Sequence, residues 1–167
     1  VAAFVLSPAW GADVFVATVS ADYGTGSTAL LADGAATADV NLLNIHSDAV
    51  VRYHDGTIYV INRTNADNIL LLDPADPGTP LSQYSVGNGS NPQDIEIVAP
   101  DRAYVTLYER DYVLIVNPVD GTELGRIDLS GFADDDGFPE ISQMARVGNR
   151  VYITVGRLDR DSFWVPA

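Results

Sequence analysis

The densest group of chemically reactive side chains is an acidic loop in the last quarter of the sequence. It reads Asp134-Asp135-Asp136-Gly137, and Glu140 follows three residues later. Like charges in a row repel one another unless water or a cation lies between them, and carboxylates are ligands that Ca²⁺ prefers. The loop is similar to an EF-hand core, but Phe132 and Gln143 stand where an EF-hand needs its first and last acidic ligands. The loop is therefore the best candidate for a metal, an irregular Ca²⁺ site formed by Asp134, Asp136 and Glu140, beside the simpler interpretation of a solvated loop.

The two histidines, His46 and His54, are the next candidates for chemistry. His46, Ser47 and Asp48 are consecutive, and neighbours along a strand point to opposite faces, so this triplet is a poor Ser-His-Asp relay. His54 precedes Asp55-Gly56, which is typical of a turn. Two imidazoles cannot complete a zinc site without carboxylates from several parts of the chain. The sequence thus offers no coherent nucleophile relay.

The composition excludes several classes of function. The chain has 167 residues with 23 acidic and 9 basic side chains, and its formal net charge is −14. This charge repels phosphate groups, so we expect no nucleic-acid partner and no insertion into a membrane. All the bases are arginine, and without lysine the chain forms neither a Schiff base nor a P-loop contact. Without cysteine it has no disulfide, thiolate nucleophile or thiolate metal site.

Repeated β-strands must position these side chains. Tyr104-Val105-Thr106 is matched by Tyr59-Val60-Ile61 and Tyr152-Ile153-Thr154, and more loosely by Phe15-Val16-Ala17, at spacings of 44, 45 and 48 residues. Other short apolar strands flank these anchors, separated by turns rich in Pro, Asp and Gly. Such units are typical of four-stranded antiparallel meanders. We predict an all-β fold, a β-propeller segment of about three and a half four-stranded blades.

The repeats also predict the domain organisation. Residues 13–167 form one propeller domain with blades near 13–46, 47–91, 92–139 and 140–167, and the first blade lacks its first strand. An open arc would expose strand edges, so we expect an incomplete ring whose partner is the remainder of its own propeller. Residues 1–12 are apolar and end in small residues, which predicts a signal-peptide remnant, with an edge strand as the alternative. The expected location is extracellular, cell-surface or periplasmic.

The anchors resemble the repeat for which YVTN β-propellers are named. The turns Asn91-Pro92 and Pro100-Asp101-Arg102, and the turn at 117–121, resemble that repeat as well. The resemblance covers residues 13–167, although the first unit matches weakly and the fourth is short. It implies a secreted bacterial propeller of unassigned activity, because this scaffold hosts surface proteins, lactonase-like enzymes and quinoprotein-like dehydrogenases alike.

The family order of strands implies where a ligand would bind. Propeller ligands usually sit at the mouth of the central channel, beside the loops that lead into each innermost strand. Carboxylate and amide oxygens at this mouth suit a hard cation or a polyhydroxylated ligand, although such side chains also cap turns. The side chains implied at the mouth are His46, Asp48, Gln93, Asp94, Glu140 and Gln143.

Our main functional prediction is a non-catalytic, secreted or cell-surface scaffold that binds a protein or carbohydrate ligand. The alternative is a propeller enzyme, lactonase-like or quinoprotein-like, in which Asp48, Asp94 and Glu140 hold a divalent cation. Arg157 and Arg160, which lie close to Asp159 and Asp161, are expected to form exposed ion pairs.

Overall fold

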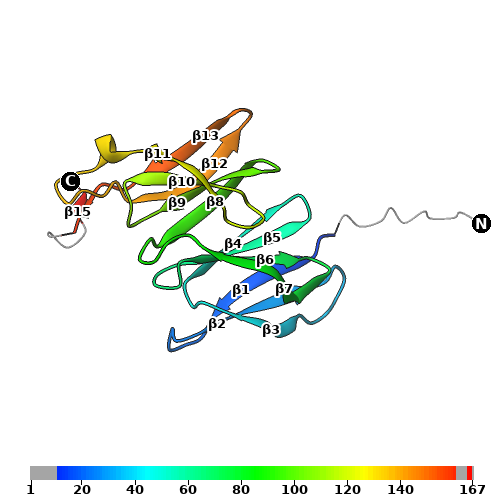
Figure 1. Cartoon of the computed structure of the whole chain (residues 1–167). Coiled ribbons are helices and arrows are strands. Elements are labelled where there is room, and N and C mark those ends of the chain that lie inside the picture. The colour runs from blue at the N-terminus through cyan, green and yellow to red at the C-terminus, as the bar shows by residue number, and fades with distance from the viewer. Residues whose placement is uncertain (1–10, 161–164, 167) are drawn as a thin grey trace, which may run out of the picture.

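The computed structural model describes residues 11–160 and 165–166, and antiparallel β-sheet dominates them (Figure 1). The predicted all-β fold class is confirmed. The predicted signal-peptide remnant or edge strand falls mainly on residues 1–10, outside the described residues. Within the described ranges, no helix is long and apolar enough to cross a membrane.

Two four-stranded sheets form the middle of the molecule, and each follows the order of its strands in the chain. The second sheet comprises β4 (Ala49–His54), β5 (Thr57–Asn62), β6 (Asn68–Asp73) and β7 (Asp76–Ser85). The third sheet comprises β8 (Pro92–Ala99), β9 (Arg102–Leu107), β10 (Tyr112–Val116) and β11 (Glu123–Asp128).

Smaller sheets flank this pair. The first sheet comprises β1 (Val14–Val19), β2 (Gly26–Leu31) and β3 (Asp39–Ile45). The fourth is the hairpin of β12 (Ile141–Val147) and β13 (Arg150–Val155), followed by the short pair β14 (Leu158–Asp159) and β15 (Val165–Pro166). A 3-10 turn, η1 (Ser130–Phe132), lies in the loop before β12.

The sheets stack face to face, and their first strands lie side by side. β4 contacts β8, β8 contacts β12, and Figure 1 shows the successive sheets layered from the first to the fourth. The anchor of the second sheet fills the space on both of its sides. Tyr59 and Ile61 of β5 pack against the third sheet, whereas Val60 between them packs against the first. Full burial of an Ile or Val side chain stabilises the fold by about 1.5–3 kcal/mol, so each sheet depends on its neighbours.

Side chains of the second sheet hold the turn at 117–121 through its backbone. The Tyr84 hydroxyl donates to the Pro118 carbonyl at 3.3 Å, and the Ser82 hydroxyl donates to the Val119 carbonyl at 3.0 Å. Gly121 has a φ of +75°, and a Cβ there would lie 2.3 Å from the Tyr84 ring. No other residue fits this position without displacing the turn.

β7 is the least regular strand of the second sheet. It runs from Asp76 to Ser85, with shifts in its register against β6. The strand accepts Pro77 and Pro80 because it is the edge of its sheet.

Candidate functional site

The candidate site lies at the end of the sheets where β4, β8 and β12 begin. We call this end the mouth. The loops leading into these strands reach it from the second, third and fourth sheets, and so do the residues that follow β5 and β9. Side chains from different sheets meet here in two junctions and one bridge across the first strands.

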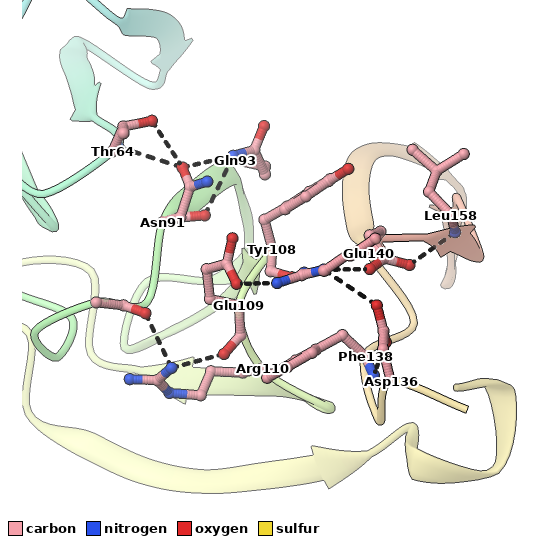
Figure 2. Close-up of polar contacts among 12 residues, drawn as sticks. Thr64, Asn91, Gln93, Tyr108, Glu109, Arg110, Asp136, Phe138, Glu140 and Leu158 are labelled. Carbon is pink, nitrogen blue, oxygen red and sulfur yellow. Dashed lines mark hydrogen bonds and ion pairs between the residues drawn. The ribbon is translucent and has the colours of Figure 1, made fainter. Parts of the chain in front are cut away.

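The first junction joins the second sheet to the third through a closed ring of hydrogen bonds. Arg63, which follows β5, pairs with Asp48 and donates to the Gln93 amide oxygen at 2.7 Å. Gln93 donates to the Asn91 side-chain oxygen at 2.9 Å. Thr64 completes the ring, because its hydroxyl bonds Asp48 at 2.8 Å and its backbone N–H donates to Asn91 at 3.2 Å. Figure 2 shows the contacts of Thr64, Asn91 and Gln93.

A buried carboxylate holds the third-sheet side of this ring in place. Asp67 is 3% exposed, and its two oxygens accept the backbone N–H groups of Gly89 at 2.7 Å and Asn91 at 2.8 Å. Asn91 has a φ of +49°, a conformation that asparagine tolerates better than most residues. The loop into β8 is therefore fixed before any ligand binds.

Asp48 is charged in this ring and remains partly open to solvent. Burial acts to raise the pKa of Asp48, but hydrogen bonds from Thr64 and Arg63, and the charge of Arg63, outweigh it and lower the pKa. The Asp48 backbone N–H donates to Nδ1 of His46 at 3.1 Å. A neutral His46 ring that accepts at Nδ1 carries its proton on Nε2.

The bridge across the first strands centres on Asp94. This carboxylate has a side chain only 1% exposed and accepts both Nε and Nη2 of Arg52, at 2.7 and 2.8 Å. It also accepts the backbone N–H of Met144 at 2.8 Å. Arg52 in turn donates to the Gln143 amide oxygen at 2.8 Å. The hydrogen bond to Asp94 raises the pKa of Arg52, so β4, β8 and β12 are joined by a permanently charged group.

The second junction joins the third sheet to the fourth around a single guanidinium. Arg160 pairs with Glu109, which follows β9, and with Glu140, which precedes β12, at 2.9 Å for the latter. Its Nε also lies 3.3 Å from a carboxylate oxygen of Asp136. The guanidinium carbon is 4.3 Å from the centre of the Phe138 ring, within cation–π range. Figure 2 shows Glu109, from the β9–β10 connection, converging with Asp136 and Glu140, which both belong to the loop before β12.

This arrangement corrects the expectation for Arg160. An exposed ion pair was expected, but its side chain is only 19% exposed and Glu140 is fully buried. Burial acts to lower the pKa of Arg160, but its hydrogen bonds to Glu109 and Glu140 outweigh it and raise the pKa. The guanidinium therefore stays charged and takes the position between the carboxylates that a bridging cation was expected to fill.

The donor sets proposed for a metal do not fit a cation as they are arranged. Asp48, Asp94 and Glu140 each pair with a different arginine. In the acidic loop, Asp136 and Glu140 share Arg160, and Asp134 accepts the Asp136 backbone N–H at 3.2 Å. Among the described residues, no three His, Cys, Asp or Glu side chains gather as a metal site. A Ca²⁺ ion at either set stays a prediction, and it would have to displace an arginine.

The six side chains expected at the mouth all lie there, but in two different roles. Gln93, Asp94 and Glu140 are buried, and their oxygens are occupied by arginines. His46 is half-buried, whereas Gln143 is exposed. Together with Asp48, these two are the members of the expected set that solvent reaches.

Sequence reasoning missed the arginines that hold the mouth together. Arg52 and Arg63 were not considered, although Arg63 directly follows the anchor strand β5. The available signal was the small number of bases, nine against 23 acids, because buried acids such as Asp94 and Glu140 need counter-ions and arginine is the base this chain has.

Comparison with known proteins shows the fold. A scan of protein-family models and a search of curated proteins found no match. Among solved structures, the crystal structure of glutaminyl cyclase from Myxococcus xanthus is similar, with a TM-score of 0.50 and 14% identity, over 87% of this chain and 69% of that chain. This likeness supports a propeller-like fold for the chain.

The same comparison corrects our main functional prediction. The expected non-catalytic scaffold is contradicted, because the solved structure that shares the fold is an enzyme. The prediction rested on the missing nucleophile relay. That absence argues only against covalent catalysis by the protein, and it leaves open reactions in which the nucleophile belongs to the substrate.

Proposed function

We propose that the mouth is the active site of a propeller enzyme that cyclises glutaminyl groups. The observation behind this proposal is that the loop into β4 and strand β12 bring His46, Asp48 and Gln143 to one end of the molecule, where solvent reaches them. Arg63 holds Asp48 there, and Arg52, which also binds the buried Asp94, holds Gln143. Such preorganised polar groups on a rigid support are what catalysis by positioning requires.

The reaction class suits a chain without a nucleophile. In a terminal glutaminyl group, the free amine attacks the carbon of the side-chain amide and closes a five-membered lactam. The C–NH₂ bond breaks, and the proton lost by the amine leaves with the nitrogen as ammonia. The protein has only to hold the amide, move one proton and exclude water.

Two side chains at the mouth suit these tasks. His46 has its Nδ1 occupied by the Asp48 backbone, so its Nε2 is the atom that can exchange a proton with the substrate. Gln143 uses its oxygen to accept from Arg52, which leaves its NH₂ group to donate to a substrate carbonyl. Asp48 remains an anion beside His46 and favours the positive charge that develops on the amine as it attacks.

Turnover by the full-length protein tests this proposal. Ammonia release and the cyclised product are followed with a peptide that begins with glutamine. His46→Asn should lower kcat roughly 100-fold, as loss of a general acid–base does. Gln143→Leu should raise KM roughly tenfold, as loss of one hydrogen bond does. Arg126→Gln, at an exposed ion pair on β11, is the control and should retain activity. Absence of turnover, or equal activity in all variants, would refute the assignment.

The alternative of a cation-dependent, lactonase-like or quinoprotein-like enzyme is separated from this proposal by calorimetry with Ca²⁺. The arginine pairing of the mouth carboxylates predicts no saturable heat. Saturable heat that is lost in Asp48→Asn would favour the cation-dependent enzyme.

We also propose that the blades are YVTN-type repeats and that the protein acts outside the cytoplasm. The first idea is supported by the anchor tyrosines Tyr59, Tyr104 and Tyr152, each in the second strand of its unit. Further sequence of the gene that lacks additional anchors at intervals of about 45 residues would contradict it. The second idea is supported by the apolar residues 1–12, and recovery of the protein only from the cytosolic fraction would contradict it.

A further inference from the structure

A cavity lies between the second and third sheets, at the end opposite the mouth. Its volume is about 330 Å³, at the lower limit of small-molecule sites. His54 at the end of β4 and Ala99 at the end of β8 line it, whereas the mouth lies where these strands begin. With a rise of about 3.3 Å per residue, the two sites are separated by most of the length of a strand.

The cavity has a fixed cationic group on one side. Arg146 of β12 donates from Nε to the Gly148 carbonyl and from Nη1 to the Ile97 carbonyl, both at 3.0 Å. These contacts orient the guanidinium but do not neutralise it. Within residues 11–160, Arg146 has no carboxylate partner, unlike Arg52, Arg63 and Arg160. Its Nη2 group is available to an anion.

Further donors and one acid border the same cavity. His54 also lines it, and no hydrogen bond to its ring is found in the described part of the chain. The two central residues of the adjoining turn, Asp55 and Gly56, have φ values of +42° and +82° and hold the end of β4 in a tight hairpin. Asp55 also borders the cavity, and its negative charge disfavours a ligand with two negative charges.

The rest of the lining is apolar and preformed. Ile97 and Tyr59 are buried, and the turn with Pro118 and Val119 is fastened by Tyr84 and Ser82. Burial raises the pKa of the Tyr59 phenol, and a hydrogen bond with Thr57 opposes this effect, so the ring stays neutral at physiological pH. A ligand that fits this cavity needs an apolar body as well as one negative charge.

We propose that this cavity binds a small monocarboxylate with an aromatic or branched apolar body. The carboxylate bonds Nη2 of Arg146 and the His54 ring, and the apolar body packs on Ile97 and the 118–119 turn. An unpaired guanidinium above an apolar wall is what recognises such an acid. This site does not depend on the function proposed for the mouth.

Titration of the ¹⁵N-labelled full chain with benzoate tests this site. Benzoate should shift the backbone amide resonances of Ala99 and Val119 saturably, and benzamide, its neutral isostere, should bind at least tenfold more weakly. Arg146→Gln should weaken benzoate binding at least tenfold. Arg150→Gln, which removes a charge from the same hairpin but does not line the cavity, should leave it unchanged.

Arg146→Lys tests whether weaker binding in Arg146→Gln merely reflects lost structure. Lysine keeps the positive charge but cannot make both backbone contacts of the guanidinium. If its spectrum matches that of the natural protein, its affinity should lie between those of the natural protein and Arg146→Gln. Absence of saturable shifts, equal binding of benzamide, or equal effects of Arg146→Gln and Arg150→Gln would overturn the proposal.

Discussion

The two junctions at the mouth occupy equivalent places between neighbouring sheets but solve the pairing of charges differently. In the first junction, Arg63 and Asp48 belong to the same blade, and the next blade offers the neutral amides of Asn91 and Gln93. In the second, both blades present acids, Glu109 and Glu140, and a cation from a later loop joins them. A junction thus closes by itself where a base such as Arg63 follows the anchor strand, and it needs a further cation where the nearby charge is an acid such as Glu109.

The difference extends to burial. The Arg63 and Asp48 side chains are 25% and 38% exposed, so water shares in their solvation. Arg160 and Glu140 are 19% and 0% exposed, with Asp136 at 13%. When one partner of a buried pair is lost, the other remains as an uncompensated charge. We conclude that the second junction depends on one residue and the first does not.

The largest effect is therefore expected from Arg160→Met. It leaves Glu140, Asp136 and Glu109 together without their shared cation, and should lower the free energy of unfolding by about 3–5 kcal/mol. Urea denaturation measures the change. Adding Glu140→Gln to Arg160→Met should recover part of the loss, because one of the stranded charges is removed. A loss no greater than that of an exposed arginine would show that the second junction is not a buried network.

Asp94→Asn should have the next largest effect. The change keeps the shape of the side chain but removes the charge that accepts two bonds from Arg52 and one from Met144. Loss of charge-assisted hydrogen bonds costs about 1.5–3 kcal/mol, and Arg52 can turn to solvent because it is 40% exposed. The same denaturation experiment measures it. If Asp94→Asn proves as costly as Arg160→Met, the exposure of the partner arginine does not moderate the loss.

Arg63→Gln tests the first junction directly and should cost about 1–2 kcal/mol, from one or two partly exposed hydrogen bonds. Asp48 keeps its bond from Thr64, and Gln93 keeps its bonds to Asn91. The comparison between junctions predicts that this loss is smaller than that of Arg160→Met. The reverse order would overturn our account of the two junctions.

The sequence predicted the antiparallel four-stranded sheets well, because strands and turns follow from neighbouring residues. The anchors at Tyr59 and Tyr104 alternate with turn residues at a regular interval, and their apolar side chains are buried as such a pattern requires. The resemblance to the YVTN repeat implied in addition that Asp48, Asp94 and Glu140 share one end, because the family order of strands makes each of them lead into the first strand of its unit. The partners were not predictable. Arg52 reaches Asp94 across 42 residues and Gln143 across 91, and these contacts depend on how the sheets stack.

The first junction should respond to acid through Asp48. Asp48 has a pKa below its ordinary value of 3.8 in the folded protein, so its contribution to stability is present above that value. This contribution is lost as the pH falls through the lowered pKa. The difference in unfolding free energy between the natural protein and Asp48→Asn should therefore shrink below about pH 4. Denaturation at a series of pH values measures it, with Asp101→Asn, in the exposed β8–β9 turn, as the control. A difference that is independent of pH would contradict the role of charge at Asp48.

The smallest effect is expected from Arg126→Gln, and it separates geometry from burial. Arg126 binds Glu123 through two bonds, at 2.8 and 3.2 Å, much as Arg52 binds Asp94. Both side chains of this pair are about half exposed, at 52% and 48%, and Arg126 also lies 4.3 Å from the centre of the Tyr112 ring. Exposed pairs contribute about 0–1 kcal/mol, so we expect a loss near the lower end of that range in urea denaturation. The bonding pattern matches that of the Asp94 bridge, and only the burial differs. A loss of unfolding free energy as large as that of Asp94→Asn would therefore mean that two-bond geometry, and not burial, determines the stability that these arginine pairs contribute.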